Sequence, residues 1–307
     1  MKKLLGKQED WVILLYYKYL PIKYPQQFAR EHLKLCKSLN LKGRIIVAKE
    51  GLNGTVGGTK KATNAHKRIM HKDPRFKGME FKIGFGDSST FKKMFVRPRK
   101  EIVTLGLRKN IDPNVDTGIY LKPSQLQKML DRKEEVILVD ARNNYESAIG
   151  KFKNAITPDI RVFKEFPKIV AQLRKYKEKK IVTYCTGGIR CEKASALLKK
   201  RGFKNVYQLE GGIIKYGQKY PDAYYEGRCF VFDGRMSIPI NTPGKEKIIA
   251  QCLHCKTSCD FYVNCCNANC NKLFICCKKC RTRWNDGCSE KCSEMPRASS
   301  IQYTSAR

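Results

Sequence analysis

Residues 181–198 read IVTYCTGGIRCEKASALL, and this stretch decides the fold of the chain around it. Its first four residues are β-branched or aromatic, which predicts a short buried strand. The strand stops at Cys185, and the glycines that follow predict a tight loop. From Cys191 onward, Ala194, Leu197 and Leu198 recur on one helical face. The pattern therefore places the Cys185 thiol between the end of a parallel strand and the beginning of a helix.

This position favours the thiolate form of Cys185. Loop N–H groups and a helix N-terminus present partial positive charge to the space in front of the sulfur. Arg190 adds a fixed charge, and such surroundings lower cysteine pKa values to about 3.5–7.5. We therefore predict a catalytic Cys185; the alternative is a structural cysteine beside a glycine turn. The predicted active-site loop consists of Thr186, Gly187, Gly188, Ile189 and Arg190.

The sequence C-T-G-G-I-R resembles the active-site loop of the rhodanese fold, in which four residues and an arginine follow the reactive cysteine. Residues 136–142, VILVDAR, resemble the rhodanese strand that ends in Asp-x-Arg. Residues 202–213, GFKNVYQLEGGI, resemble the closing strand and turn. Strands and helices alternate over residues 124–220, which predicts a parallel α/β domain with Cys185 at the carboxyl edge of its sheet.

Three neighbours of Cys185 have predicted roles. Asp140 and Arg142 are expected to support the loop through an ion pair rather than to contact a substrate. Cys191 could resolve an oxidised Cys185 by forming a disulfide. It could equally pack as a small apolar residue, and the sequence leaves both roles open.

The chain carries a formal net charge of +34 over 307 residues, a length sufficient for two or three domains. Such a charge predicts attraction to a polyanion, and nucleic acid is the first candidate. The alternative is that the lineage has a lysine-rich proteome and that these charges lie on solvated surface without binding a partner. No targeting segment is evident, and no stretch approaches the roughly 18 apolar residues of a membrane span. We expect a cytoplasmic protein that binds no membrane, with its oligomeric state left open.

Residues 1–108 are predicted to form an α+β domain. The expected order is strand, helix, two strands, helix, strand, which is that of the ferredoxin-like fold. The predicted strands cover residues 11–19, 44–48, a short part of 51–58, 80–83 and 91–96, and the predicted helices begin at residues 26 and 59. The glycines of EGLNGT, residues 50–55, are interpreted as turns because the Walker spacing is absent.

Basic residues crowd the end of this domain and are interleaved with Phe91 and Phe95. Basic side chains beside aromatic rings suit phosphate contacts combined with base stacking. An edge strand protected by solvated lysines explains the same pattern equally well. The candidates for RNA binding are Lys92, Lys93, Arg97, Arg99 and Lys100.

Residues 109–123 have the composition of a linker, and Ser124 is expected to cap the helix that opens the rhodanese-like domain. Residues 221–292 are predicted to form a separate cysteine-rich module. We expect residues 293–307 to be a disordered tail.

Eleven of the 15 cysteines crowd between residues 252 and 292. In a reducing compartment this density indicates metal binding rather than disulfides, and C-x2-C knuckles suit two tetrahedral structural zinc sites. An iron–sulfur cluster is the rival interpretation. The expected ligands are Cys252, Cys255, Cys265 and Cys270 for one site and Cys277, Cys280, Cys288 and Cys292 for the other. His254 or Cys259 could replace a ligand, and interleaved pairing is possible.

Taken together, residues 11–292 resemble the rhodanese-domain tRNA uridine 5-hydroxylases. The matching segments are EGLNGT at 50–55, CTGGIRCEKAS at 185–195, LEGGI at 209–213, FVFD at 230–233 and YVNC at 262–265. The resemblance implies an acylphosphatase-like N-terminal domain and the oxygen-dependent conversion of uridine 34 in tRNA anticodons to 5-hydroxyuridine. It also implies that Cys185 is the essential thiol.

Two other functions remain open at the level of sequence. A thiosulfate or persulfide sulfurtransferase would use Cys185 as its sulfur carrier. In a non-catalytic RNA-binding scaffold, Cys185 would have no chemical role. The retained pair of Cys185 and Arg190 disfavours the scaffold. No flavin, haem or non-haem iron motif is evident, so the resemblance leaves oxygen activation unexplained.

Overall fold

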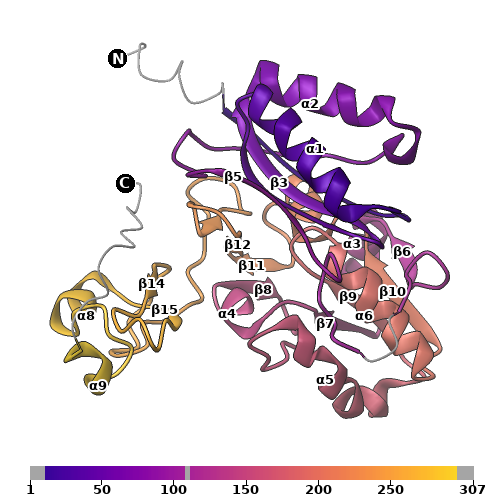
Figure 1. The fold of residues 1–307 in the computed structure, drawn as a ribbon. Helices are drawn as coiled ribbons and strands as arrows, with labels where there is room; N and C mark the ends of the chain where they lie inside the picture. Colours follow the sequence, from indigo (N-terminus) through magenta and orange to yellow (C-terminus); the bar gives the residue numbers. More distant parts are fainter. Residues whose placement is uncertain (1–10, 108–110, 296–307) are drawn as a thin grey trace.

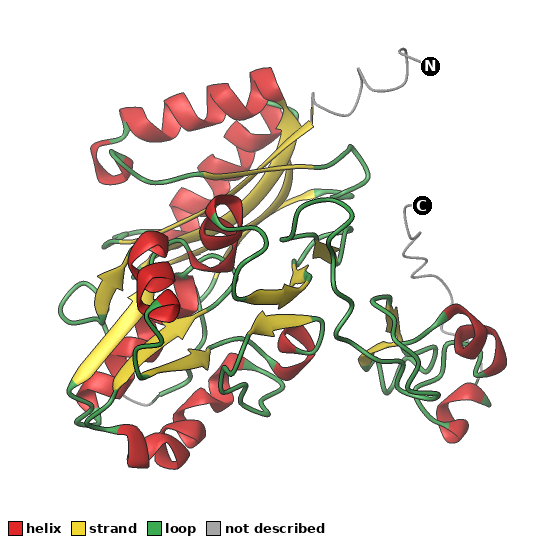
Figure 2. Ribbon diagram, turned by 180° about the vertical axis from the view of Figure 1, so that it is seen from behind, coloured by secondary structure: helices red, strands yellow, loops and turns green. Residues whose placement is uncertain are grey.

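The computed structural model describes residues 11–107 and 111–295. It has the mixed α/β architecture expected from the sequence, with an N-terminal α+β domain, a central parallel α/β domain and a cysteine-rich module at one side of the molecule (Figure 1). Helices α1 and α2 cover one face of the N-terminal sheet, and the other face is turned toward the central domain (Figures 1 and 2).

The N-terminal domain has the predicted ferredoxin-like topology, with an added edge strand. Its sheet has the order β4-β1-β3-β2-β5, in which β5 pairs parallel to β2 and the other neighbours are antiparallel. The elements are β1 (Trp11–Tyr19), α1 (Pro25–Ser38), β2 (Lys42–Ala48), β3 (Gly51–Thr59), α2 (Lys60–Lys72), a 3₁₀ turn at Pro74–Phe76, β4 (Lys82–Phe85) and β5 (Met94–Pro98).

Strand β3 is longer than expected, because the glycine-rich segment is sheet throughout rather than a turn containing a short strand. Gly51 has a φ of +142°, and a Cβ there would lie 2.1 Å from the Lys18 carbonyl oxygen of β1. Gly54 is not a turn residue; it lies within β3, where a Cβ would approach the Tyr16 ring to 2.8 Å. Both glycines therefore allow close packing inside the sheet.

The core between this sheet and its two helices contains two histidines, His32 and His66, beside the apolar residues Leu14, Ile45 and Val56. Burial lowers the pKa of His32 to about 4, and burial together with His32 lowers that of His66 to about 3. Both rings are therefore neutral in this core.

The central domain is built on a four-stranded parallel sheet of order β6-β10-β9-β7. Its main elements are β6 (Ile119–Leu121), α3 (Pro123–Asp131), β7 (Val136–Asp140), α4 (Asn144–Ser147), β8 (Gly150–Phe152), α5 (Phe166–Gln172), β9 (Lys180–Tyr184), α6 (Ile189–Lys200), β10 (Asn205–Leu209) and α7 (Gly212–Lys219), with 3₁₀ turns at Phe163–Glu165 and Leu173–Tyr176.

Two local expectations at the start of this domain are wrong. Strand β6 lies inside the segment expected to be a linker, because its residues pair with β10 at the edge of the sheet. Helix α3 begins at Pro123, and its N-cap is Lys122 rather than Ser124. The fixed φ of proline suits the first helical position, so the cap lies two residues upstream of Ser124.

The C-terminal region begins with β11 (Tyr225–Gly227), which pairs with β8 of the central domain. It continues through β12 (Cys229–Phe230), β13 (Ser237–Ile238), β14 (Tyr262–Asn264), β15 (Leu273–Ile275), α8 (Lys278–Arg283) and α9 (Glu290–Ser293). The predicted disordered tail lies almost wholly outside the described residues, which end at Met295. Among the described residues, no helix combines the length and apolarity that crossing a membrane requires.

Candidate active site

The predicted strand, loop and helix around Cys185 are present. Strand β9 ends at Tyr184, and α6 begins at Ile189. The Gly188 N–H donates to Cys185 Sγ at 3.1 Å. Gly188 has a φ of +101°, a left-handed conformation that glycine adopts without strain. The loop is therefore folded around the sulfur.

The two loop glycines also allow the N-terminal domain to pack closely against the loop. A Cβ on Gly187 would lie 2.8 Å from Leu15 Cδ2, and one on Gly188 would lie 3.0 Å from the Tyr17 hydroxyl. Both neighbours belong to β1. The glycines thus serve the contact between two domains as well as the conformation of the loop.

The surroundings of Cys185 stabilise its thiolate, although the residue is only 1% exposed. Burial acts to raise the pKa of the thiol. A hydrogen bond from Cys191, the charge of Arg190 and the N–H groups of Arg190 and Gly188 outweigh it, so the pKa falls to about 5. Cys185 is therefore ionised at neutral pH, as the activated thiol predicted from the sequence requires.

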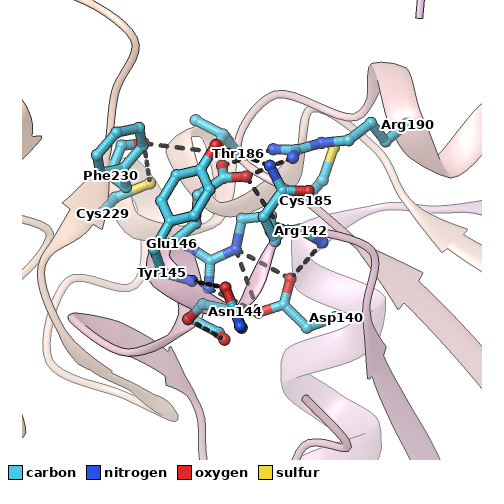
Figure 3. Close-up of polar contacts among 12 residues, drawn as sticks. Asp140, Arg142, Asn144, Tyr145, Glu146, Cys185, Thr186, Arg190, Cys229 and Phe230 are labelled. Atoms are coloured by element: carbon cyan, nitrogen blue, oxygen red, sulfur yellow. Dashed lines mark hydrogen bonds and ion pairs between the residues drawn. The ribbon is translucent and has the colours of Figure 1, made fainter. Parts of the chain in front are cut away.

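Arg190 is held by a carboxylate whose role the sequence did not reveal. Its two terminal nitrogens donate to the Glu146 oxygens at 2.5 and 2.7 Å (Figure 3), and Glu146 is fully buried. After the penalty of burial, the charge of Glu146 is the largest influence on Arg190, and it raises the pKa of the guanidinium. Arg190 therefore stays charged beside the sulfur in a buried site.

The expected ion pair between Asp140 and Arg142 is present directly beneath the loop (Figure 3). Both side chains are completely buried, and Arg142 also donates to the Gly150 carbonyl at 2.7 Å. The Arg142 guanidinium lies 5.8 Å from the ring centre of Tyr184, the residue before Cys185. The pair joins the end of β7 to β8 and underlies the strand that carries the thiol.

Cys191 lies in the first turn of α6 and is completely buried. Burial and the neighbouring Cys185 both raise the pKa of this thiol. Cys191 is therefore a protonated partner of the Cys185 thiolate. Its proposed role as a resolving thiol stays a prediction.

Cys185 lies at the floor of a cleft of about 640 Å³ between the two domains. The open face of the N-terminal sheet forms one wall, through Leu15 and Tyr17 of β1 and neighbouring strands. The opposite wall is the active-site loop, and residues 231–240 close a third side. Phe232 stands on that side, 57% exposed, with its ring centre 5.9 Å from the Arg190 guanidinium. We call this space the interdomain cleft.

The predicted basic residues extend one wall of the interdomain cleft. Arg44 and Ile46 of β2 line the cleft, and their parallel neighbours on β5 are Phe95 and Arg97. Directly paired residues share a face of the sheet. Phe95 and Arg97 are exposed, with the Arg97 guanidinium 4.7 Å from the Phe95 ring centre. The other four candidates, Lys92, Lys93, Arg99 and Lys100, are exposed around the same edge strand.

A buried lysine joins the two domains, although the sequence pattern places it on the polar face of its helix. Lys193 of α6 is completely buried and donates to Glu50 at 2.8 Å and to Glu101 at 2.6 Å. It also donates to the Val103 carbonyl at 3.0 Å. Lys193 lies on the helical face opposite Ala194, Leu197 and Leu198, where the sequence gives no sign that it is buried. Its three partners all precede residue 108, so the contact is visible only in three dimensions.

The eight predicted metal ligands form two four-cysteine clusters, but the expected partition is wrong. The clusters are Cys252, Cys255, Cys277 and Cys280, and Cys265, Cys270, Cys288 and Cys292. The hairpin of β14 and β15 explains this interleaving, because it folds the chain back so that the Leu253 N–H donates to the Ile275 carbonyl at 2.8 Å. The knuckle of Cys277 and Cys280 therefore lies beside the knuckle of Cys252 and Cys255.

The spacing of the sulfurs fits a tetrahedral metal ion. Cys255 Sγ lies 3.6 Å from Cys277 Sγ, and Cys288 Sγ lies 3.6 Å from Cys270 Sγ and 3.9 Å from Cys292 Sγ. Four thiolates at about 2.3 Å from a zinc ion would stand about 3.8 Å apart. A disulfide would need about 2.05 Å. Both clusters thus have the donor number, donor type and spacing of a structural zinc site.

A buried thiolate in a rhodanese loop, roofed by a ferredoxin-like sheet, defines a rhodanese-domain protein of the class with a fused N-terminal domain. Family models agree: residues 11–102 match the UPF0176 acylphosphatase like domain, 122–219 the Rhodanese-like domain and 226–293 the Rhodanase C-terminal region. A solved rhodanese-like domain from Anabaena is 22% identical, covering 35% of this chain and 78% of that one with a TM-score of 0.30.

Curated relatives match over almost the whole chain. A protein named tRNA uridine(34) hydroxylase from Bacillus licheniformis is 48% identical, covering 94% of this chain and 90% of the relative. A protein of the same name from Bacillus cytotoxicus is 46% identical with the same coverage. The chain belongs to the tRNA uridine(34) hydroxylase family.

Proposed function

We propose that this protein hydroxylates C5 of uridine 34 in the anticodon of tRNA, with molecular oxygen as co-substrate and Cys185 as the essential thiol. The observation that carries the proposal is a thiolate at the floor of a cleft of about 640 Å³ whose wall continues into a basic edge strand. The cytoplasm, where tRNA and reduced thiols are found, is the compartment that this reaction implies.

The interdomain cleft suits a single extruded nucleotide. Enzymes that modify a base take it out of the stack and hold it in a pocket, and pockets of about 300–1,000 Å³ are typical of small-molecule sites. Leu15 and Ile46 offer apolar surface to the faces of a base, while Asn53 and Thr55 offer polar groups to its edge. Cys185 would then lie below the inserted ring.

The thiolate gives the uracil ring the reactivity that hydroxylation needs. Addition of Cys185 Sγ to C6 forms a carbon–sulfur bond and moves an electron pair onto C5 and O4, as an enolate. Arg190, which lines the cleft, offsets that charge. The nucleophilic C5 then gains one atom of dioxygen. The second atom leaves as water, for which an external reductant supplies two electrons and solvent supplies, in net, two protons. Loss of the C5 proton then breaks the carbon–sulfur bond and releases the Cys185 thiolate.

The exposed basic residues around β5 would contact the tRNA backbone near the anticodon. Arg97 and Phe95 lie side by side on the face that continues into the interdomain cleft, which combines a phosphate partner with a surface for base stacking. A strand leaving the cleft along β5 would also meet Lys93 and Arg99. Binding by these residues should weaken as salt rises.

The two four-cysteine clusters are proposed to hold one structural zinc ion each. When bound, the ions would supply no chemistry to the reaction; they would fix the fold of the module. Tyr262 of this module donates to the Tyr145 carbonyl, and its ring lies 5.1 Å from that of Phe230. Both contacts lie next to the active-site loop, so the module supports the cleft from outside.

Mass spectrometry of nucleosides from tRNA incubated with the protein in air tests the proposal. We expect uridine to gain one oxygen with the natural protein and with the control Cys266→Ala, whose cysteine lies outside both clusters, but not with Cys185→Ala. Under ¹⁸O₂ the added oxygen should carry the label. Unmodified tRNA together with turnover of thiosulfate would support the sulfurtransferase instead, an activity that the names of the curated relatives do not favour.

A further inference from the structure

Three metal-binding side chains meet in the core of the N-terminal domain, away from the interdomain cleft. His32 and Cys36 lie one turn apart on α1, and His66 faces them from α2. One ring nitrogen of each histidine and the Cys36 sulfur all lie within 4.8 Å of one another. Cys36 and His66 are completely buried, and His32 is 5% exposed.

The two imidazoles are not satisfied by the protein. Buried polar atoms normally have hydrogen-bond partners, and each exception calls for an explanation such as an ion. His32 Nε2 and His66 Nδ1 are both buried without a partner in the described structure. The Tyr16 hydroxyl lies 3.0 Å from His66 Nε2, so the second nitrogen of that ring is the one left available.

The walls around the cluster are aromatic. The His32 ring stacks on Phe28 at 5.3 Å and 13°, and Phe81 meets the His66 ring edge-on at 6.2 Å. These contacts orient both rings before any ligand binds, as the outer partners of metal ligands commonly do. The Tyr16 hydroxyl adds a polar restraint to His66.

We propose that His32, Cys36 and His66 bind one thiophilic metal ion in the core of the N-terminal domain. Two imidazoles and one thiolate suit Cu⁺ or Zn²⁺. Charge favours Cu⁺, because one thiolate and one monovalent cation cancel, whereas Zn²⁺ leaves a net charge in an apolar core. Binding releases the Cys36 proton to solvent, and no electron is transferred.

This site is distinct from the reaction centre. Along β1, Tyr16 is buried on the helix side of the sheet, whereas Leu15 and Tyr17 line the interdomain cleft. The ion would therefore join α1 to α2 behind the sheet. Its role would be to fix the wall that faces the substrate, without contact with the reacting atoms.

Cadmium-113 NMR of the full chain loaded with Cd²⁺ tests the proposal, because the chemical shift of cadmium reports its donor atoms. We expect three signals: two from the four-cysteine clusters in the all-sulfur region, and a third displaced upfield by two nitrogen donors. Cys36→Ser and His66→Phe should each remove the third signal alone. The matched control is Cys229→Ala, another fully buried cysteine outside the clusters, and it should retain all three.

The natural protein alone can overturn the proposal, even if a core variant fails to fold. Two signals at saturating Cd²⁺, or three that all report four sulfur donors, would exclude the site. So would a third signal that persists in Cys36→Ser. Metal analysis of the chain from copper-supplied and zinc-supplied cells then separates the ions: copper retained by the natural chain and lost in Cys36→Ser identifies Cu⁺, whereas zinc falling from three ions to two identifies Zn²⁺.

Discussion

Glu146 binds Arg190 through two hydrogen bonds of 2.5 and 2.7 Å, and the Glu146 and Arg190 side chains are only 0% and 10% exposed. Arg190 in turn places its charge beside Cys185, where it helps to hold the thiolate. Glu146 lies in α4 and Cys185 follows β9, so the fold joins residues that are 39 positions apart. The carboxylate therefore acts on the sulfur through the arginine.

Replacing Glu146 by glutamine should destabilise the protein by about 3–5 kcal/mol, because removal of one partner leaves a buried guanidinium without its counter-charge. The loss would be measured as a shift in the midpoint of urea unfolding. Glu135→Gln is the control, since Glu135 is 68% exposed in its pair with Lys179 and such pairs contribute about 0–1 kcal/mol. Equal effects of the two substitutions would contradict the special role of Glu146.

Alkylation of Cys185 by iodoacetamide should report its lowered pKa of about 5. Only the thiolate reacts, so the rate should rise with pH, level off above about pH 6 and fall roughly tenfold per unit well below pH 5. Arg190→Gln should move this profile to higher pH, because it removes a positive charge from beside the sulfur. Mass spectrometry of the labelled peptide gives the rate.

Cys36 is the internal control for that experiment, since burial raises its pKa to about 12. It should stay unlabelled while Cys185 reacts. A Cys185 profile that keeps rising toward pH 9 would show that the loop does not stabilise the thiolate.

Lys193→Met should loosen the contact between the two domains. The substitution preserves most of the side-chain volume but leaves Glu50 and Glu101 without their shared cation, and breaking a buried pair typically costs about 3–5 kcal/mol. We expect a lower midpoint of denaturant unfolding and faster hydrogen exchange in β1. Lys200→Met on the exposed side of the same helix is the control; a similar loss there would indicate helix propensity rather than the interdomain contact.

The sequence predicted the chemistry of neighbouring residues better than the contacts between residues that are distant in the chain. The strand, loop and helix around Cys185 followed from residues that are neighbours in the chain, and the order of elements was sufficient for the ferredoxin-like topology. The burial and the partners of Glu146 and Lys193 were not predicted, because charged residues carry no sign of burial until the fold supplies a partner. The linker assignment failed at β6 for a related reason, since the strand exists only because β10 offers a free edge.

The fold determines which cysteines share a metal site, and the number of zinc ions that variants retain can test this assignment. Because Cys252 and Cys277 belong to one cluster, the double substitution Cys252→Ser with Cys277→Ser should remove one zinc ion from the module and leave the other. Cys252→Ser with Cys265→Ser takes one ligand from each cluster and should weaken both sites. Consecutive pairing along the chain predicts the reverse. Zinc released on titration with a chelator, measured for both double variants and the natural protein, distinguishes the two arrangements. Release of one ion from the Cys252–Cys265 variant and of both from the Cys252–Cys277 variant would refute the interleaved clusters.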